Sequence, residues 1–380
     1  MSEVIGKTKD ENYLVTYIPI RKIQVISDVK LTIDNLLFRQ INFENISFNL
    51  ALSPAKLLIR NLFVSSKQDF LDLDLDFEAR SIKPTVMFKI HDGNITFNEK
   101  SISELLLLKD NLLEKFAIDK FEFNLNAYLS GINFGKIPFN KVILSATSND
   151  NLINVKNFDS NIFGGKSQLS GSILLMPFTL NFVYGLNSID ISMLNNILGD
   201  GYNTGVLSAN GMWATKGSTI NELFYNFYVK SNILAKNIYI NNFSIDQLIS
   251  KINNPSFDLN NLDKEVKKSL ITGQTEINEF KTNFELIKGL ISMKETEFTT
   301  KFASAVASTV INLYESTIYS ISSFSFLLGK SVRNAIDSYQ TINLPVKVSG
   351  NMFSSKKETD ILLIRNSVEK FRGIIEKKEP

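Results

Sequence analysis

The chain has 380 residues, of which 44% are hydrophobic and 21% are charged, a balance typical of a globular protein with a sizeable core. Its 41 basic and 39 acidic residues nearly cancel, so no strong field attracts nucleic acid, and we expect no nucleic acid as a partner. The chain has no cysteine and one histidine, His91, which removes thiolate nucleophiles, disulfides and most zinc sites. We therefore expect no enzyme, no cofactor and no metal.

The sequence contains no clear membrane-spanning helix. Residues 1–13 lack the apolar region of a signal peptide or anchor, which leaves open whether the protein starts further upstream. The most apolar later stretch, residues 302–329, is rich in Ser and Thr and is interrupted by Glu315. It falls short of the roughly 20 unbroken apolar residues that a span requires.

Apolar and polar residues alternate with a period of two along most of the chain, which predicts half-buried β-strands. Short turn-prone pieces such as Ser53-Pro54 and Gly164-Gly165 separate the strands and favour antiparallel pairing between neighbours. The clearest alternating segments are residues 29–33, 46–52, 71–77, 86–90, 121–125, 178–184 and 346–348.

Helical patterns are few and short. Four segments open near a Ser and carry apolar residues at spacings of three and four: residues 102–116, 188–198, 218–227 and 244–252. A fifth segment near the C-terminus is amphipathic and basic. Its apolar stripe is predicted to contact a membrane or to cap the sheet, and consists of Ile361, Ile364, Val368, Phe371 and Ile375.

A short repeat suggests two similar β units in tandem. INFENISFN begins at Ile41 and INFGKIPFN begins at Ile132, and the two share six residues at matching places. The sequence thus predicts a mainly β chain of tandem curled antiparallel sheet units that form a trough or groove, with short helices between segments and a C-terminal amphipathic helix.

The alternating apolar faces are the candidate functional surface. If two sheets pack face to face, these residues form a dry sandwich core, whereas one long curled sheet would line an open trough for acyl chains. The candidate lipid-facing residues are Phe48, Leu50, Leu73, Leu75, Phe88, Phe121, Phe123, Phe178, Leu180 and Phe182.

Two polar patterns are explained more simply by a position on the protein surface than by metal binding or catalysis. Asp72, Asp74 and Asp76 imitate the start of a calcium loop, but Phe77 replaces the required Gly, so they are expected to share the solvent face of a strand. His91 stands beside Asp92 before a glycine turn and is expected to be a surface residue rather than a general base.

FGGKSQLSGSILL at Phe163 is followed by an Asp-containing helix pattern, a Gly-led strand pair and a helix pattern that contains Ser218 and Glu222-Leu223. This order of motifs resembles the AsmA-like family of bacterial envelope proteins. TGQTEINEFKTNFELIKGLIS from Thr272 and NLPVKVSGN from Asn343 are similar to that family's closing strands. The resemblance covers residues 118–378, and the first β unit looks like a degenerate copy.

The resemblance implies a domain division and a function. It implies an N-terminal extension at residues 1–22, a first β unit at 23–117, the AsmA-like region at 118–350 and a tail at 351–380. It also implies a protein of the Gram-negative periplasm, tethered to the inner membrane, whose apolar groove binds or conducts phospholipid or another acyl-chain lipid. The expected partners are lipid, a membrane surface and other envelope proteins. The alternative is an interaction scaffold that assists outer-membrane protein assembly, with a dry sandwich core and no lipid.

Overall fold

The computed structural model describes most of the chain, and all structural statements below concern these residues. They are residues 27–38, 41–53, 55–67, 69–79, 83–97, 121–198, 204–254, 256–329 and 339–376.

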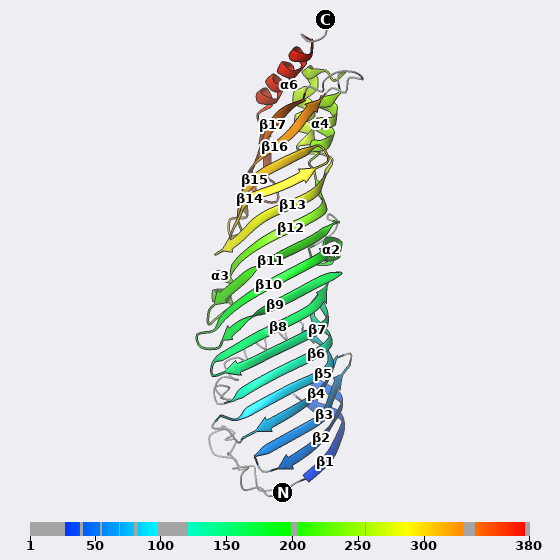
Figure 1. Ribbon diagram of the computed structural model, residues 1–380, viewed down its shortest axis with the longest axis vertical. Helices are drawn as coiled ribbons and strands as arrows, with labels where there is room; N and C mark the ends of the chain where they lie inside the picture. Colours follow the sequence, from blue (N-terminus) through cyan, green and yellow to red (C-terminus); the bar gives the residue numbers. More distant parts are fainter. Residues whose placement is uncertain are drawn as a thin grey trace.

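The protein is mainly β, as the alternation predicts, and its strands form one long open sheet (Figure 1). The strands are β1 (Ser27–Phe38), β2 (Ile41–Ser53), β3 (Lys56–Ser66), β4 (Asp69–Glu78), β5 (Thr85–Phe97), β6 (Glu122–Phe134), β7 (Ile137–Asn149), β8 (Leu152–Ile162), β9 (Gly165–Leu174), β10 (Thr179–Asp190), β11 (Val206–Lys216), β12 (Tyr228–Asn241), β13 (Gln274–Ile287), β14 (Leu290–Thr300), β15 (Ala303–Asn312), β16 (Thr317–Gly329), β17 (Tyr339–Asn351) and β18 (Lys356–Thr359).

Each strand pairs with its neighbours in the chain, so the sheet runs from β1 to β18 in sequence order. Every pairing is antiparallel except that of β5 with β6, which is parallel. Seventeen spacings of about 4.8 Å make the sheet roughly 80 Å long. The sheet continues through the β5–β6 junction and does not curl into separate units. In the part of the chain described, no second sheet faces it, so the sandwich alternative does not apply.

Tight turns explain why a meander forms. At the β13–β14 turn Lys288 and Gly289 both have positive φ, at 46° and 72°, and at the β8–β9 turn Phe163 and Gly164 have φ of 45° and 73°. Two consecutive residues with positive φ give the hairpin turn whose twist matches that of the flanking strands. At these turns the chain therefore returns directly against the preceding strand.

The short sequence repeat does not correspond to a structural repeat. Residues 41–49 lie within the single strand β2, whereas residues 132–140 cross the turn between β6 and β7. Gly135, with φ of 59°, allows the second copy to turn, and the first copy has Glu44 at the matching position. Two similar sequence segments thus form one continuous strand at residues 41–49 and part of a hairpin at residues 132–140.

The helices are short and lie beside the sheet. They are α2 (Ile191–Leu198), α3 (Ile220–Tyr225), α4 (Ile245–Asn253), a 3₁₀ turn (Leu259–Asn261), α5 (Leu262–Ser269) and α6 (Ile361–Glu376). Four match predicted helices: α2, α3, α4 and α6. Helix α5 was not predicted, and the predicted helix at residues 102–116 lies outside the described residues. The apolar stretch 302–329 forms β15 and β16, and no helix in the described ranges is long and apolar enough to cross a membrane.

The largest core lies at the C-terminal end, where α4, α5 and α6 pack on β15 to β17 (Figure 1). Phe324, Leu328, Ile342 and Leu344 from the strands are no more than 3% exposed there. The start of α4 is held by Thr275 of β13, whose hydroxyl accepts from the Ile245 amide at 3.0 Å and donates to the Phe243 carbonyl at 2.6 Å. This polar contact satisfies backbone groups that the buried helix terminus would otherwise leave unpaired.

Candidate functional site

The strand register places eight of the ten sequence-predicted lipid-facing residues on one face of the sheet. Directly paired residues of neighbouring strands point to the same side. Leu50 is connected to Leu75 through Ile59, and Leu75 pairs with Phe88. Alternation along each strand adds the remaining strand residues: Phe48, Leu73, Phe123, Leu180 and Phe182. We call this side of the sheet the apolar face.

One line of cross-strand partners on this face is apolar or glycine through sixteen consecutive strands. We call it the apolar row. It runs from β1 to β16 and consists of Val29, Leu50, Ile59, Leu75, Phe88, Leu125, Ala146, Val155, Gly171, Phe182, Trp213, Val229, Leu286, Ile291, Ile311 and Ile318. No charged or hydrogen-bonding side chain, apart from the indole of Trp213, interrupts it.

The side chains of the apolar row are partly buried, but most of them are not fully covered. Ala146 and Phe182 are buried, Val29 is 45% exposed, and the other residues of the row are half-buried. The residues that precede and follow the row on each strand point to the opposite face and are mostly polar. An example is Leu75, which stands between Asp74 and Asp76. The sheet is therefore amphipathic along its length.

Aromatic rings gather at the middle of the row. The rings of Phe182 and Trp213 stack with centroids 4.8 Å apart, and Phe227 lies 5.9 Å from Trp213. On the other side of Phe182 the row has Gly171, where an added Cβ would lie 2.8 Å from the Phe182 ring and 2.1 Å from the Asn181 carbonyl oxygen. Glycine thus lets the Phe182 ring lie close against the neighbouring strand. Trp213 is the only tryptophan in the chain.

Two predicted residues lie just outside strands. The Phe121 ring lies 6.2 Å from that of Phe77, which follows Leu73 and Leu75 on the apolar face. Phe178 is half-buried in the turn between β9 and β10, where its carbonyl accepts from the Gly217 amide at 3.1 Å. Sequence reasoning missed the C-terminal part of the row, which includes Trp213, Leu286, Ile291, Ile311 and Ile318. The alternation that identifies the others is present there also.

The predicted membrane-contact stripe of α6 faces the protein core. Ile364 and Val368 are fully buried, Phe371 is 8% exposed, and Ile361 packs against the same cluster. The side chain of Ile375 lies outside the described part of the chain. The contacts of α6 are those of a cap on the sheet, and the residues it exposes include Leu362, at 69%.

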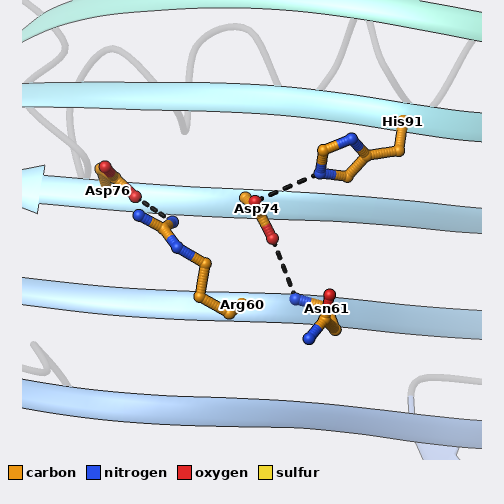
Figure 2. A network of polar contacts seen from close by, with 5 residues as sticks. All are labelled: Arg60, Asn61, Asp74, Asp76 and His91. Atoms are coloured by element: carbon orange, nitrogen blue, oxygen red, sulfur yellow. Dashed lines mark hydrogen bonds and ion pairs between the residues drawn. The ribbon is translucent and has the colours of Figure 1, made fainter.

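On the opposite face, two of the three predicted aspartates, Asp74 and Asp76, are held by ion pairs and hydrogen bonds within the sheet (Figure 2). Asp76 pairs with Arg60, and Asp74 accepts from the Asn61 amide at 2.9 Å and lies 3.2 Å from His91 Nε2. Arg60 and Asn61 occupy a register shift in β3, so the Asp74 carboxylate fills a break in the β-ladder. Partial burial opposes ionisation of Asp74, but the contacts with Asn61 and His91 outweigh it and lower its pKa.

Asp92 has a similar role at the parallel junction. Its carboxylate accepts from the Ser130 hydroxyl at 2.6 Å, the Gly93 amide at 2.7 Å and the Ser130 amide at 3.0 Å. Direct pairing of β5 with β6 is interrupted between Ile90 and Asn94 without a change of register, and in this gap the carboxylate accepts from the Ser130 amide of β6. The Ser130 hydroxyl, followed by the two amides, lowers the pKa of Asp92 despite its partial burial.

A cleft of about 730 Å³ lies over β9 to β14, and none of the predicted lipid-facing residues lines it. Its walls carry Gln168, Asn210, Asn232 and Asn283, and the Asn232 amide donates to Asn210 at 3.3 Å. These side chains offer hydrogen bonds, and Lys281, Glu295 and Glu297 add charged groups to the same walls. Among the residues that the structure describes, no group of three or more His, Cys, Asp or Glu side chains is placed to hold a metal ion.

Comparison of the chain with known protein families, with curated proteins and with solved structures finds no match to any of them.

Proposed function

We propose that the apolar face binds the acyl chains of phospholipid or of another acyl-chain lipid, and that the apolar row conducts them along the sheet. The single observation that carries the proposal is the continuity of the row across sixteen strands. A face that only closed a core would need a covering layer along its whole length, whereas most of the row is half-buried.

The dimensions suit movement of a lipid tail as well as binding. Fifteen strand spacings give the row a length of roughly 70 Å, and one lipid tail spans about half of a hydrocarbon layer about 30 Å thick. A tail can therefore shift by one strand at a time and remain on apolar surface. Each buried methylene contributes about 0.8 kcal/mol, which offsets the ordering of the tail.

The cellular setting of this proposal rests on the resemblance to AsmA-like proteins. On that basis we place the protein in the Gram-negative periplasm, tethered to the inner membrane and acting in envelope assembly without catalysis. The apolar row supports lipid as the partner. The domain division of the sequence analysis stays a prediction.

Trp213 provides a direct test, because it is the only tryptophan and lies within the row. A phospholipid brominated on its acyl chains should quench Trp213 fluorescence, and the unbrominated lipid should not. The control is a double variant, Trp213→Phe with Met212→Trp. It moves the indole to the opposite face of β11, where Met212 is 43% exposed, and should escape quenching.

A matched pair of charge substitutions tests whether lipid lies on the row. Ile291 is in the row, and Ser292 is the next residue of β14 on the opposite face; both are half-buried. Ile291→Asp should weaken lipid binding by about tenfold or more, because the carboxylate must lose water when a tail covers it. Ser292→Asp should leave binding unchanged. Equal binding by both folded variants, or no quenching in the parent, would overturn the proposal.

The interaction scaffold remains the second candidate. The exposed edge of β1 favours it, because a strand of another protein can pair there. A scaffold of this kind predicts that Trp213 is unaffected by brominated lipid while β1 still captures a partner strand.

A further inference from the structure

The two ends of the sheet differ in how their edges are protected. Strand β18 has four residues, three of them charged, and β17 beside it carries Pro345. Short, charged strands and proline are the usual means of preventing edge-to-edge pairing. Strand β1 has twelve residues without proline, and Val29 and Leu31 are 45% and 38% exposed. Within the described ranges, β2 is the only strand that pairs with β1.

We propose that β1 pairs with β1 of a second copy of this chain, in an antiparallel arrangement centred on Thr32. The argument for a second copy is the charge pattern. Lys30 and Asp34 are equally distant from Thr32 and are both exposed on the polar face. Two-fold antiparallel pairing about Thr32 therefore places each Lys30 opposite Asp34 of the other copy, and opposite charges at directly paired positions stabilise a sheet.

Registers centred on either charged residue, and registers that pair even-numbered with odd-numbered residues, are less favourable. A register centred on Lys30 places the two lysines opposite each other, and one centred on Asp34 does the same with the two aspartates; both destabilise the pair. Pairing that brings even-numbered against odd-numbered residues would turn the apolar face of one copy toward the polar face of the other. One carboxylate oxygen of Asp34, Oδ1, accepts a hydrogen bond from the Asn45 side-chain amide at 3.0 Å. The other oxygen, Oδ2, takes no part in this hydrogen bond.

The arrangement joins the two apolar faces on one side. With Thr32 at the centre, Leu31 of each copy lies opposite Ile33 of the other, on the same face as the apolar row. The two helix-covered ends then lie at opposite extremes of a sheet of twice the length. This inference goes beyond the proposed function, and its test uses no lipid.

The absence of cysteine makes the register directly measurable. A single Thr32→Cys substitution would place two cysteines opposite each other, with Cα atoms about 4.5 to 5.5 Å apart, within the range of a disulfide. Lys30→Cys is the matched control, because its two copies would be four residues, or about 13 Å, apart along the strands. Under mild oxidation we expect a covalent dimer from Thr32→Cys, none from Lys30→Cys, and a dimer again when Lys30→Cys and Asp34→Cys chains are mixed.

Charge exchange tests the same pairing without oxidation. Light scattering of the parent chain should give twice the 42.9 kDa of one copy. Lys30→Asp should raise the dimer dissociation constant about tenfold, and the double variant Lys30→Asp with Asp34→Lys should restore it. Circular dichroism confirms that each variant is folded. A monomeric parent, as expected if residues 1–26 of the same chain cover β1, would overturn the inference. So would equal crosslinking of Thr32→Cys and Lys30→Cys.

Discussion

The apolar row and the helix-covered core show two outcomes of the same sequence pattern. Leu286 in the row and Leu344 in the core both follow a polar residue on a long antiparallel strand. Leu344 is 1% exposed because α4, α5 and α6 pack over it, whereas Leu286 is half-buried beside its strand neighbours. An alternating strand therefore specifies an amphipathic sheet, and a separate layer decides whether its apolar side becomes a core or a binding surface.

The largest expected effect separates these two regions directly. Leu344→Ala should lower the free energy of unfolding by about 2 to 5 kcal/mol, because it leaves a cavity beneath the helices. Leu286→Ala should cost only about 1 kcal/mol, because its side chain is only partly removed from water. Urea unfolding measures both. Equal losses would show that the row is covered as completely as the core.

The Asp92→Asn variant tests whether polar contacts between strands stabilise the N-terminal part of the sheet. Loss of the charged acceptor should cost about 1.5 to 3 kcal/mol, because three donors from β5 and β6 converge on it. Hydrogen exchange should rise at the β5–β6 junction and not beneath the helices. Uniform exchange along the whole sheet would contradict this division.

The same variant has a pH signature. The pKa of Asp92 is lowered in the folded protein, so its contribution is complete above the unfolded value of about 3.9 and disappears as pH falls through the folded value. The difference in unfolding free energy between the parent and Asp92→Asn should therefore be constant near neutral pH and shrink in acid. A difference that grows in acid would contradict the assigned contacts.

Asp74→Ala should produce a smaller loss, of about 1 kcal/mol, because the Asn61 amide at the β3 irregularity loses its acceptor but remains near water (Figure 2). His91→Ala provides the comparison within the same network and should cost less, since it removes no backbone hydrogen bond. Thermal unfolding measures both, and a larger loss for His91→Ala would reverse this ranking.

The smallest effect is expected at the surface of the covered end. Arg365 of α6 donates to Asp263 of α5 at 2.8 Å, and the Asp263 side chain is 52% exposed. Arg365→Gln should change the unfolding free energy by at most about 1 kcal/mol, because exposed ion pairs are largely screened. Val368→Ala, on the buried side of the same helix, should cost more in the same urea titration. The opposite order would mean that charge, not packing, holds α6 to the sheet.

The sequence by itself determined the mainly β fold, most of the short helices and the residues that share the apolar face. Period-two alternation is a local property, so Leu73, Leu75 and Phe88 could be assigned to one side before any strand was paired. The alternation also runs through β13 to β16, where Leu286 and Ile291 extend the row beyond the residues that were singled out. The sequence did not predict helix α5, because the apolar residues Leu262 and Val266 are too few in this strongly charged segment to form a clear apolar stripe.

Only the tertiary structure decided which alternating faces are covered and how the strands line up. The stripe of α6 has the same spacing whether it meets a membrane or a core, and its contacts with β17 and α5 show that Ile364 and Val368 cap the sheet. The matching segments at Ile41 and Ile132 form different structures because Gly135 permits a turn where Glu44 continues a strand. The apolar row depends on register across sixteen strands. A tight turn sets the pairing of Leu286 with Ile291, but Val229 and Leu286 are 57 residues apart, and only the hydrogen bonds of the folded sheet align them.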